Sequence, residues 1–157
     1  MDLENKMGTF NLLINKILRI AKSASNRNEK LMNICKLLED NVAYYDWVGF
    51  YMADESKEVL TLGPFVGEST EHTSIRFGDG ICGQAVVNQK TFIVQDVEAE
   101  TNYLSCSPLV RSEIVVPIMK NDKVIGELDI DSHTTGPFTD EDSEFLENIC
   151  NIVSQLF

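Results

Sequence analysis

Hydrophobic positions recur at helical spacing at both ends of the chain, and each stripe predicts an amphipathic helix. The first stripe is Phe10, Leu13, Ile14, Ile17, Ile20 and Ala21, and the polar segment KSASNRNEK separates it from a second, Leu31, Ile34, Cys35, Leu38 and Val42. The third stripe is Phe145, Ile149, Ile152, Val153 and Leu156. Thr139, followed by three acidic residues, predicts the N-cap of this last helix, because a hydroxyl group and carboxylates stabilise the free N–H groups there.

The segment between the helices alternates short apolar runs with turn residues, which is typical of antiparallel strands. The predicted strands are DWVGFYMAD, KEVLTLGPF, TSIRF, TFIVQDV, SEIVVPIMK and KVIGELDIDS. The second strand is expected to end at Gly63-Pro64, and Asn121-Asp122 is expected to join the last two strands. One short helix is expected in GQAVVNQK, and EAETNYLSCSPLV is expected to be an irregular loop.

These elements predict one α+β domain over residues 1–157, with a mainly antiparallel sheet flanked by N-terminal and C-terminal helices. Its expected parts are two helices in residues 1–43, the sheet and its loops in 44–138, and a closing helix in 139–157. A chain of 157 residues is long enough for one domain with a substantial core.

The net charge of −12, from 25 acidic and 13 basic residues, narrows the possible partners. Nucleic acids and anionic membranes bind clusters of Lys and Arg, so neither is expected as a partner. The N-terminus lacks a signal-peptide pattern and no apolar run reaches the length of a membrane span, which favours a cytoplasmic protein with reduced cysteines. Without C-x-x-C pairs and with only two histidines, a Cys/His zinc site is not expected, and no metal or cofactor is predicted.

The segment GDGICG, residues 78–83, has the glycine spacing of a dinucleotide-binding turn. That fold requires a buried parallel strand before the turn and a full crossover helix after it, and the flanking sequence favours neither. The alternative is a turn that presents the thiol of Cys82 at the start of a short helix, where free N–H groups and the helix dipole would lower its pKa. Packing of Cys82 as a small apolar residue beneath the helix is an equally good interpretation.

Other residues with possible chemistry are a loop thiol and a set of carboxylates. Cys106 lies between two serines, where a thiol is more reactive than in a core, although it could also be a buried loop anchor. Asp129 and Asp131 are two residues apart and therefore share one face of a strand, and Glu113 on the neighbouring strand could lie beside them. If the three carboxyl groups converge, their repulsion raises at least one pKa, which yields a proton donor, and the group attracts an ammonium ion. The alternative is a solvated edge of the sheet.

Two aromatic residues also share one face of a predicted strand, because they are an even number of positions apart. Trp47 and Tyr51 are four residues apart on one strand face, where they serve either as core residues or as the wall of a small-molecule pocket. Cys35 and Cys150 fall on or beside the apolar stripes of their helices and are expected to pack in the core.

The segments DWVGFY, LGPF, GICG, SEIVVP, GELDIDS and FTDEDSEFLE together resemble the single-domain GAF proteins that are free methionine-R-sulfoxide reductases. The resemblance runs from about residue 45 to the C-terminus. It implies a sheet flanked by helices, often in a homodimer, and it implies that Cys106 is the nucleophile that attacks the sulfoxide sulfur. The three carboxyl groups described above would bind the substrate's ammonium group and sulfoxide oxygen, and Trp47 and Tyr51 would surround its S-methyl end.

The resemblance also implies how the nucleophile is regenerated. A sulfenic acid on Cys106 would condense with a second thiol to a disulfide, which a thioredoxin-type reductant reopens. Many members of the family carry this resolving cysteine at the position of His72, so here the role falls to Cys82 or to an external thiol. The family usually has GHIACD where this chain has NYLSCS, which is closer to sensory GAF domains. A non-catalytic GAF module that binds a small molecule or senses redox state is the alternative function.

Overall fold

The structure is a computed structural model that describes residues 2–105 and 107–157. Its helices are α1 (Leu3–Lys22), α2 (Arg27–Asn41), α3 (Gly80–Asn88) and α4 (Asp140–Ser154), with a short 3-10 helix at Val97–Ala99. Its strands are β1 (Trp47–Asp54), β2 (Val59–Val66), β3 (Ser74–Arg76), β4 (Phe92–Val94), β5 (Ser112–Lys120) and β6 (Lys123–Ser132). The elements follow one another in the order that the sequence predicts.

The strands join into one antiparallel sheet in the order β3-β2-β1-β6-β5-β4. β1 and β6 lie at its centre with a strand on either side, and residues 47–51 of β1 and 126–132 of β6 are buried. The hairpin between β5 and β6 turns at Asn121 and Asp122, whose φ angles of 52° and 63° are those of a tight type I′ turn. The predicted α+β fold with an antiparallel sheet is confirmed.

One predicted boundary is wrong. β2 does not end at Gly63-Pro64 but continues to Val66. Its register against β1 shifts between Gly49 and Tyr51, so an irregularity in the ladder accommodates the extra residue and the proline. Proline is tolerated at a bulge because its missing N–H group is not needed there. The longer β2 therefore runs beside almost the whole of β1.

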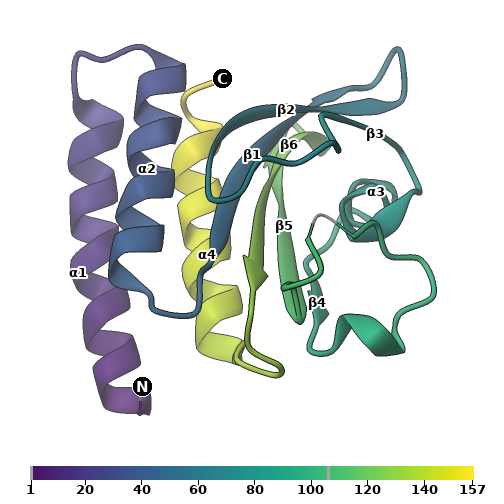
Figure 1. Cartoon of the computed structure of the whole chain (residues 1–157). Helices are drawn as coiled ribbons and strands as arrows, with labels where there is room; N and C mark the ends of the chain where they lie inside the picture. Colours follow the sequence, from purple (N-terminus) through teal and green to yellow (C-terminus); the bar gives the residue numbers. More distant parts are fainter. Residues whose placement is uncertain (1, 106) are drawn as a thin grey trace.

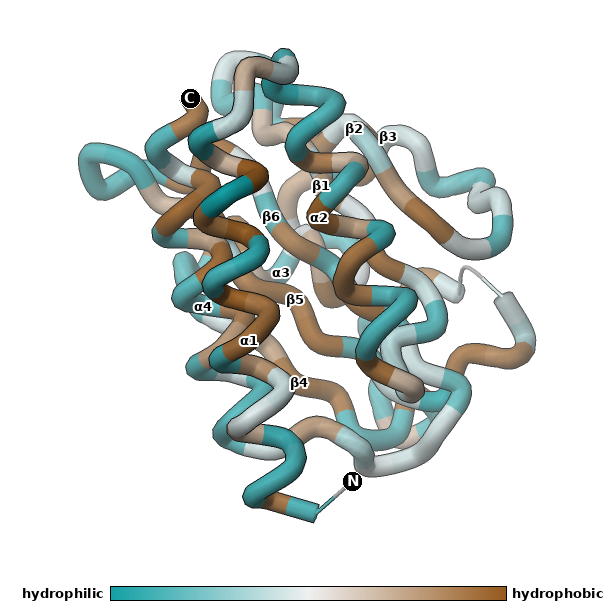
Figure 2. Tube along the Cα trace, turned by 90° about the vertical axis from the view of Figure 1, so that its left-hand side faces the viewer, coloured by the Kyte–Doolittle hydropathy of each residue, from teal (hydrophilic) through white to brown (hydrophobic). Residues whose placement is uncertain are grey.

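Helices α2 and α4 pack on one face of the sheet, and α1 packs against both of them (Figure 1). Figure 2 shows this helical side from the front, with apolar and polar segments alternating along α1 and α4 as the stripes predict. Phe10 of α1 stacks on Phe145 of α4, with the two ring centroids 4.0 Å apart. Thr139 caps α4 in a capping box with Asp142, as its position in the sequence predicts.

Asp142 also fixes the N-terminal helix to the rest of the molecule. Its carboxylate is completely buried and forms an ion pair with the ammonium group of Lys6 on α1. The hydroxyl groups of Tyr44 and Tyr45 each donate a hydrogen bond of 2.7 Å to the other carboxylate oxygen. The buried charge is therefore neutralised and hydrogen-bonded, as a charge in a protein interior must be.

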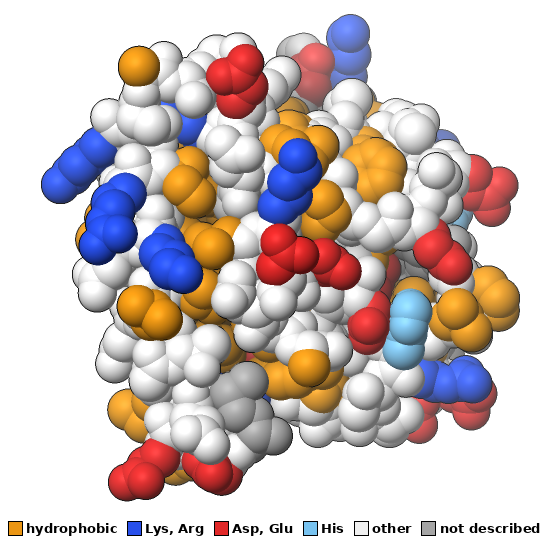
Figure 3. Space-filling view, turned by 60° about the vertical axis from the view of Figure 1, so that its left-hand side comes forward, with side chains coloured by type: hydrophobic (Ala, Val, Ile, Leu, Met, Phe, Trp, Pro, Cys, Tyr) orange, Lys and Arg blue, Asp and Glu red, His pale blue; other side chains and the backbone are white. Residues whose placement is uncertain are grey.

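The surface of this side carries charges of both signs. In Figure 3, acidic and basic side chains are interspersed, with apolar side chains in the gaps between them. None of the helices in the described part of the chain is long and apolar enough to cross a membrane.

The opposite face of the sheet is covered by α3 and by the loops that flank it (Figure 1). A second hydrophobic cluster lies between α3 and the sheet, and it includes Trp47, Tyr51, Cys82, Val86 and Val115. Three of the residues that the sequence singles out for chemistry therefore lie in this smaller layer.

Candidate active site

Four carboxyl groups share the face of the sheet that α3 covers. Glu127, Asp129 and Asp131 occupy alternate positions of β6, so their side chains point to the same side. Glu113 of β5 lies opposite Asp131 in the ladder. All four residues are buried, with between 0% and 6% of their surface exposed. The predicted convergence of Glu113, Asp129 and Asp131 is therefore observed, and the alternative of a solvated sheet edge is wrong.

β1 brings two aromatic residues to the same face beside β6. Trp47 lies opposite Asp131 and Tyr51 lies opposite Glu127, with Gly49 between the two aromatic positions. A Cβ atom on Gly49 would come within 2.4 Å of the Trp47 ring, so glycine allows the indole to lie over the strand. The ring centroids of Trp47 and Tyr51 are 6.4 Å apart, and the two rings form one aromatic wall.

Both aromatic side chains are hydrogen-bonded to the connection between β2 and β3. The Trp47 indole N–H donates to the carbonyl oxygen of Glu68 at 3.0 Å, and the Tyr51 hydroxyl donates to that of His72 at 2.9 Å. The Nε2 atom of His72 in turn lies 2.8 Å from the carbonyl oxygen of Ser105. These contacts tie β1 to the two loops that border the site.

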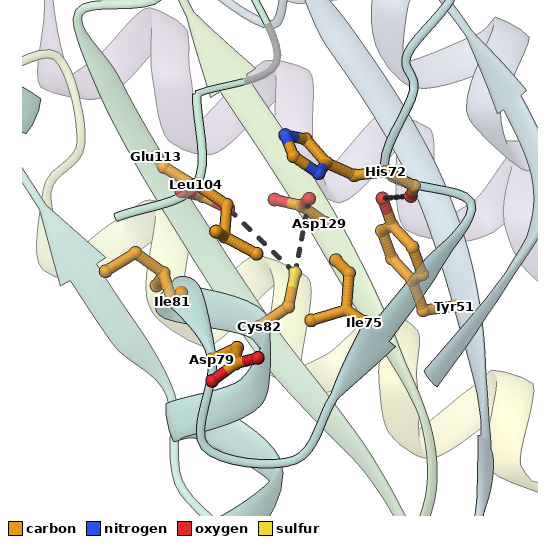
Figure 4. A pocket seen from close by; sticks show the side chains of 10 residues that line it. Tyr51, His72, Ile75, Asp79, Ile81, Cys82, Leu104, Glu113 and Asp129 are labelled. Carbon is orange, nitrogen blue, oxygen red and sulfur yellow. Dashed lines mark hydrogen bonds between the residues drawn. The ribbon is translucent and has the colours of Figure 1, made fainter. Parts of the chain in front are cut away.

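Cys82 reaches the carboxyl groups from α3 (Figure 4). Its Sγ atom lies 3.4 Å from Oδ2 of Asp129 and 4.0 Å from Oε1 of Glu113. Donor atoms of the three residues all lie within 4.8 Å of one another, close enough to share one metal ion. α3 begins at Gly80, where φ is 64° and an added Cβ would come within 2.9 Å of Leu104, so this turn requires glycine.

The environment of Cys82 overturns the predicted thiol activation. Burial, followed by the charges of Asp129, Glu127 and Glu113, raises the pKa of Cys82 well above its usual value. The predicted lowering of this pKa by the helix N-terminus is wrong, because desolvation and nearby anions both disfavour a thiolate. Cys82 is buried as the packing interpretation expects, but its thiol faces carboxylates rather than apolar side chains alone.

The carboxyl groups are themselves shifted toward their neutral forms. Burial raises the pKa of Asp129 to about 6, although hydrogen bonds with Glu113 and Cys82 act in the opposite direction. Burial, and then the charge of Asp129, raise the pKa values of Glu127 and Asp131 well above the usual range. Among the described residues, no hydrogen-bond partner reaches either oxygen of Glu127, Oδ1 of Asp129 or Oδ2 of Asp131. Buried carboxyl oxygens without hydrogen-bond partners favour a ligand that brings a positive charge or a proton.

The predicted site residues border two neighbouring cavities. The first, of about 10 Å³, is lined by Tyr51, Cys82, Glu113 and Asp129 together with His72, Ile75, Asp79, Gly80, Ile81 and Leu104. The second, of about 20 Å³, is lined by Trp47 and Asp131 together with Asp46, Glu68, Ser107, Val110 and His133. The predicted nucleophile, Cys106, lies outside the described residues, whereas Leu104 and Ser107 on either side of it border the first and second cavity respectively.

The two helical cysteines lie away from this site. Cys35 of α2 and Cys150 of α4 are buried in the larger core, as their places on the hydrophobic stripes predict. Burial raises the pKa of both thiols. Their surroundings are those of structural cysteines.

Sequence reasoning missed Glu127 and gave His72 too little weight. The signal for Glu127 was present, because in GELDIDS it shares the odd-numbered positions of Asp129 and Asp131. His72 gave no such signal. Its contact with Ser105 joins loops that are 33 residues apart in the chain, and no local pattern predicts that contact.

Comparison with known proteins gives a consistent picture. The sequence model of the GAF domain family matches residues 26–157. The chain is 36% identical over 156 residues to GAF domain-containing protein A of Dictyostelium discoideum, covering 97% of each chain. It is also 36% identical over 119 residues to free methionine-R-sulfoxide reductase of Escherichia coli, covering 76% of this chain and 70% of the relative.

A solved structure extends the likeness to the whole chain. The X-ray structure of free methionine-R-sulfoxide reductase from Neisseria meningitidis in complex with its substrate superimposes with a TM-score of 0.92 at 33% identity. The match covers 100% of this chain and 91% of the other. The chain therefore belongs to the GAF domain family, in the group that contains the free methionine-R-sulfoxide reductases.

Proposed function

We propose that this protein reduces free methionine-R-sulfoxide to methionine, with Cys106 as the nucleophile and Cys82 as the resolving cysteine. The observation that carries the proposal is the buried cluster of carboxyl groups that meets the thiol of Cys82 beside an aromatic wall. Two related proteins named as reductases of this substrate support it, one of them solved as a complex with its substrate. The chain on both sides of residue 106 borders the cavities at this cluster.

The carboxyl groups suit both polar ends of the substrate. The ammonium group of methionine sulfoxide would bring a positive charge to the buried carboxyl groups of Glu113, Asp129 and Asp131. A carboxyl group with a raised pKa also keeps a proton near neutral pH and can donate it to the sulfoxide oxygen. Trp47 and Tyr51 would contact the S-methyl end, because an aromatic wall favours a small apolar group.

The reaction would proceed in three balanced steps. The Cys106 sulfur attacks the sulfoxide sulfur, the S–O bond breaks, and protonation of the oxygen gives methionine and a sulfenic acid on Cys106. The Cys82 sulfur then attacks this sulfenic acid, which forms a disulfide and releases water. A thioredoxin-type dithiol reduces the disulfide and is itself oxidised to a disulfide.

Asp129 has a specific part in the second step. A thiol with a raised pKa is a weak nucleophile, so Cys82 must lose its proton as it attacks. The Cys82 thiol donates a hydrogen bond to Asp129 Oδ2 at 3.4 Å, which makes this carboxylate the nearest base. Asp129 would therefore accept the thiol proton, and the departing hydroxide would leave as water after protonation by a neighbouring carboxyl group.

Substrate entry requires the loop before β5 to move. The cavity of about 10 Å³ has room for roughly one water-sized body, far less than an amino acid. Leu104 and His72 both line this cavity, and His72 contacts the carbonyl oxygen of Ser105, the residue after Leu104. Displacement of these two loop residues would open the space between α3 and the aromatic wall.

The test is reduction of the free R and S epimers of methionine sulfoxide by the full chain, with dithiothreitol or thioredoxin and its reductase. We expect turnover of the R epimer only, and turnover at the background rate for Cys106→Ser. Cys150→Ala is the matched control, because this thiol is buried in the larger core, and it should retain activity. Turnover that survives Cys106→Ser would refute the nucleophile, and binding without any turnover would favour a non-catalytic GAF module.

A second measurement tests the resolving role. Substrate added without reductant should produce a Cys82–Cys106 disulfide that peptide mapping detects. Cys82→Ser should still release one equivalent of methionine but leave a sulfenic acid that a trapping reagent labels. Rapid turnover of Cys82→Ser with thioredoxin would assign resolution to an external thiol.

A further inference from the structure

We propose that Cys82, Glu113 and Asp129 form a binding site for a single zinc ion. The three ligands come from α3, β5 and β6, and each side chain is at most 6% exposed. Their donor atoms already lie within 4.8 Å of one another. The ligand set of one thiolate and two carboxylates differs from the Cys/His sites that sequence spacing can indicate.

The distances match those that zinc imposes on its ligands. With Zn–S of about 2.3 Å and Zn–O of about 2.1 Å in a tetrahedral site, sulfur and oxygen are about 3.6 Å apart. The observed separations are 3.4 Å between Cys82 and Asp129 and 4.0 Å between Cys82 and Glu113. Shifts of a few tenths of an ångström would therefore bring each of the two oxygen atoms to the separation from sulfur that a shared zinc ion requires.

An unsatisfied buried oxygen points independently to a ligand. Asp129 is 1% exposed and lines the cavity, yet its Oδ1 atom has no hydrogen-bond partner among the described residues. Glu127, also buried next to the cluster, adds a further carboxyl group without a partner on either oxygen in the described chain. A divalent cation bound by both oxygens of Asp129 would satisfy Oδ1 and would offset negative charge in the cluster, which isolated carboxylates cannot do for one another.

The chemistry of the donors selects zinc over the common hard cations. Mg²⁺ and Ca²⁺ prefer six or more oxygen ligands, whereas a thiolate with two carboxylates suits a borderline-soft ion. The cavity of about 10 Å³ has room for roughly one water-sized body, which is the space that a single ion would occupy. Binding would release the Cys82 proton to solvent, since the thiolate is the form that coordinates.

Such an ion would occupy the groups that the proposed reaction needs. On the proposed function, zinc would exclude the substrate ammonium group and block Cys82, so the protein would be inhibited reversibly by zinc and reactivated by a chelator. This consequence rests on the proposed function, whereas binding of the ion does not.

The experiment titrates Co²⁺ and Zn²⁺ into reduced full-length Cys106→Ser protein, which removes the other loop thiol. We expect one equivalent of Co²⁺ to produce a thiolate-to-cobalt charge-transfer band, and one equivalent of Zn²⁺ to abolish it. Cys82→Ser in the same background should lose the band, and Asp129→Asn should weaken binding by at least about 100-fold. Cys150→Ala is the matched control and should leave both titrations unchanged.

The outcomes separate binding from catalysis. Absence of the band, a band that survives Cys82→Ser, or unchanged affinity in folded Asp129→Asn would each overturn the zinc site. Circular dichroism verifies that each variant is folded, and Cys82→Ser provides the decision if Asp129→Asn fails to fold. One-equivalent binding to Cys106→Ser, together with no sulfoxide turnover by the unsubstituted protein, would support the zinc site and refute the reductase. Sulfoxide turnover by the unsubstituted protein, together with absence of the cobalt band, would support the reductase and refute the zinc site.

Discussion

Replacement of Glu127 by glutamine isolates the energetic cost of the buried carboxyl cluster. Glu127 is fully buried, and neither of its oxygens has a partner among the described residues. Burial and the charge of Asp129 raise its pKa well above the usual 4.5. The glutamine side chain has the same shape but cannot ionise, so the variant removes the titration and keeps the packing.

The sign of the effect follows from proton linkage. Above pH 4.5 the unfolded chain has lost the Glu127 proton while the folded protein still holds it, so unfolding releases a proton. Rising pH therefore favours unfolding, and the wild-type free energy of unfolding falls by about 1.4 kcal/mol per pH unit from this group. The fall begins near pH 4.5 and ends at the pKa of the folded state. Glu127→Gln lacks this loss, so it should be increasingly more stable than wild type as the pH rises.

Thermal unfolding by circular dichroism at pH 4.5, 5, 6 and 7 measures this difference. At this chain length about 1 kcal/mol shifts Tm by roughly 2–4 °C, so the gap in Tm should widen by about 3–6 °C per pH unit. Each solution contains a chelator, so that no metal ion neutralises the cluster. Glu39→Gln, at an exposed position of α2, is the matched control and should show no such trend. A gap that stays constant from pH 5 to pH 7 would refute the assignment of a buried carboxyl group with a raised pKa.

Three other changes test separate parts of the structure. Gly49→Ala places a methyl group 2.4 Å from the Trp47 ring, so it should lower the free energy of unfolding by about 1–3 kcal/mol in chemical denaturation and raise the KM for methionine sulfoxide. An unchanged free energy of unfolding would contradict the packing of the indole. Lys6→Met leaves the buried carboxylate of Asp142 without its cation and should lower the free energy of unfolding in chemical denaturation by about 3–5 kcal/mol. A free energy equal to that of the wild type would show that the ion pair does not stabilise the fold. His72→Ala removes the contact with the loop before β5, so it should increase proteolytic cleavage in that loop and raise KM. His72→Gln keeps a hydrogen-bond donor and should bring cleavage and KM back toward the wild-type values. Equal cleavage of the wild type and both variants would show that the contact does not hold the loop.

The spacing of apolar residues predicted most of the fold, because a helix or strand that buries one face must repeat apolar residues at its own period. The helical stripes and the strand runs each place apolar residues toward one layer, and the turn at Asn121-Asp122 carries the residues that its backbone needs. The error at Gly63-Pro64 has a physical cause. Proline usually ends a strand, but here a shifted register against β1 accommodates it, and that register depends on tertiary pairing.

The alternation of side chains along a strand predicted which carboxyl groups of the site share one face. Alternation places Asp129 and Asp131 on one face, but it does not show what covers that face. The prediction that the helix N-terminus lowers the pKa of Cys82 failed for this reason. Its position at a helix N-terminus is visible in the sequence, whereas the carboxyl groups from β5 and β6 that face it come from residues 31 and 47 positions further along the chain. Their charges and the burial dominate the thiol pKa.

The position of the single tryptophan has a practical consequence. Trp47 lies over Gly49, stacks with Phe65 and borders the second cavity beside Asp131. Selective excitation at the red edge of the absorption band would therefore report on this wall alone. Changes in indole emission would follow ligand entry and loop displacement in the unlabelled protein, in the absence of turnover. The fluorescence of Trp47 thus provides a direct measurement of ligand binding at the site.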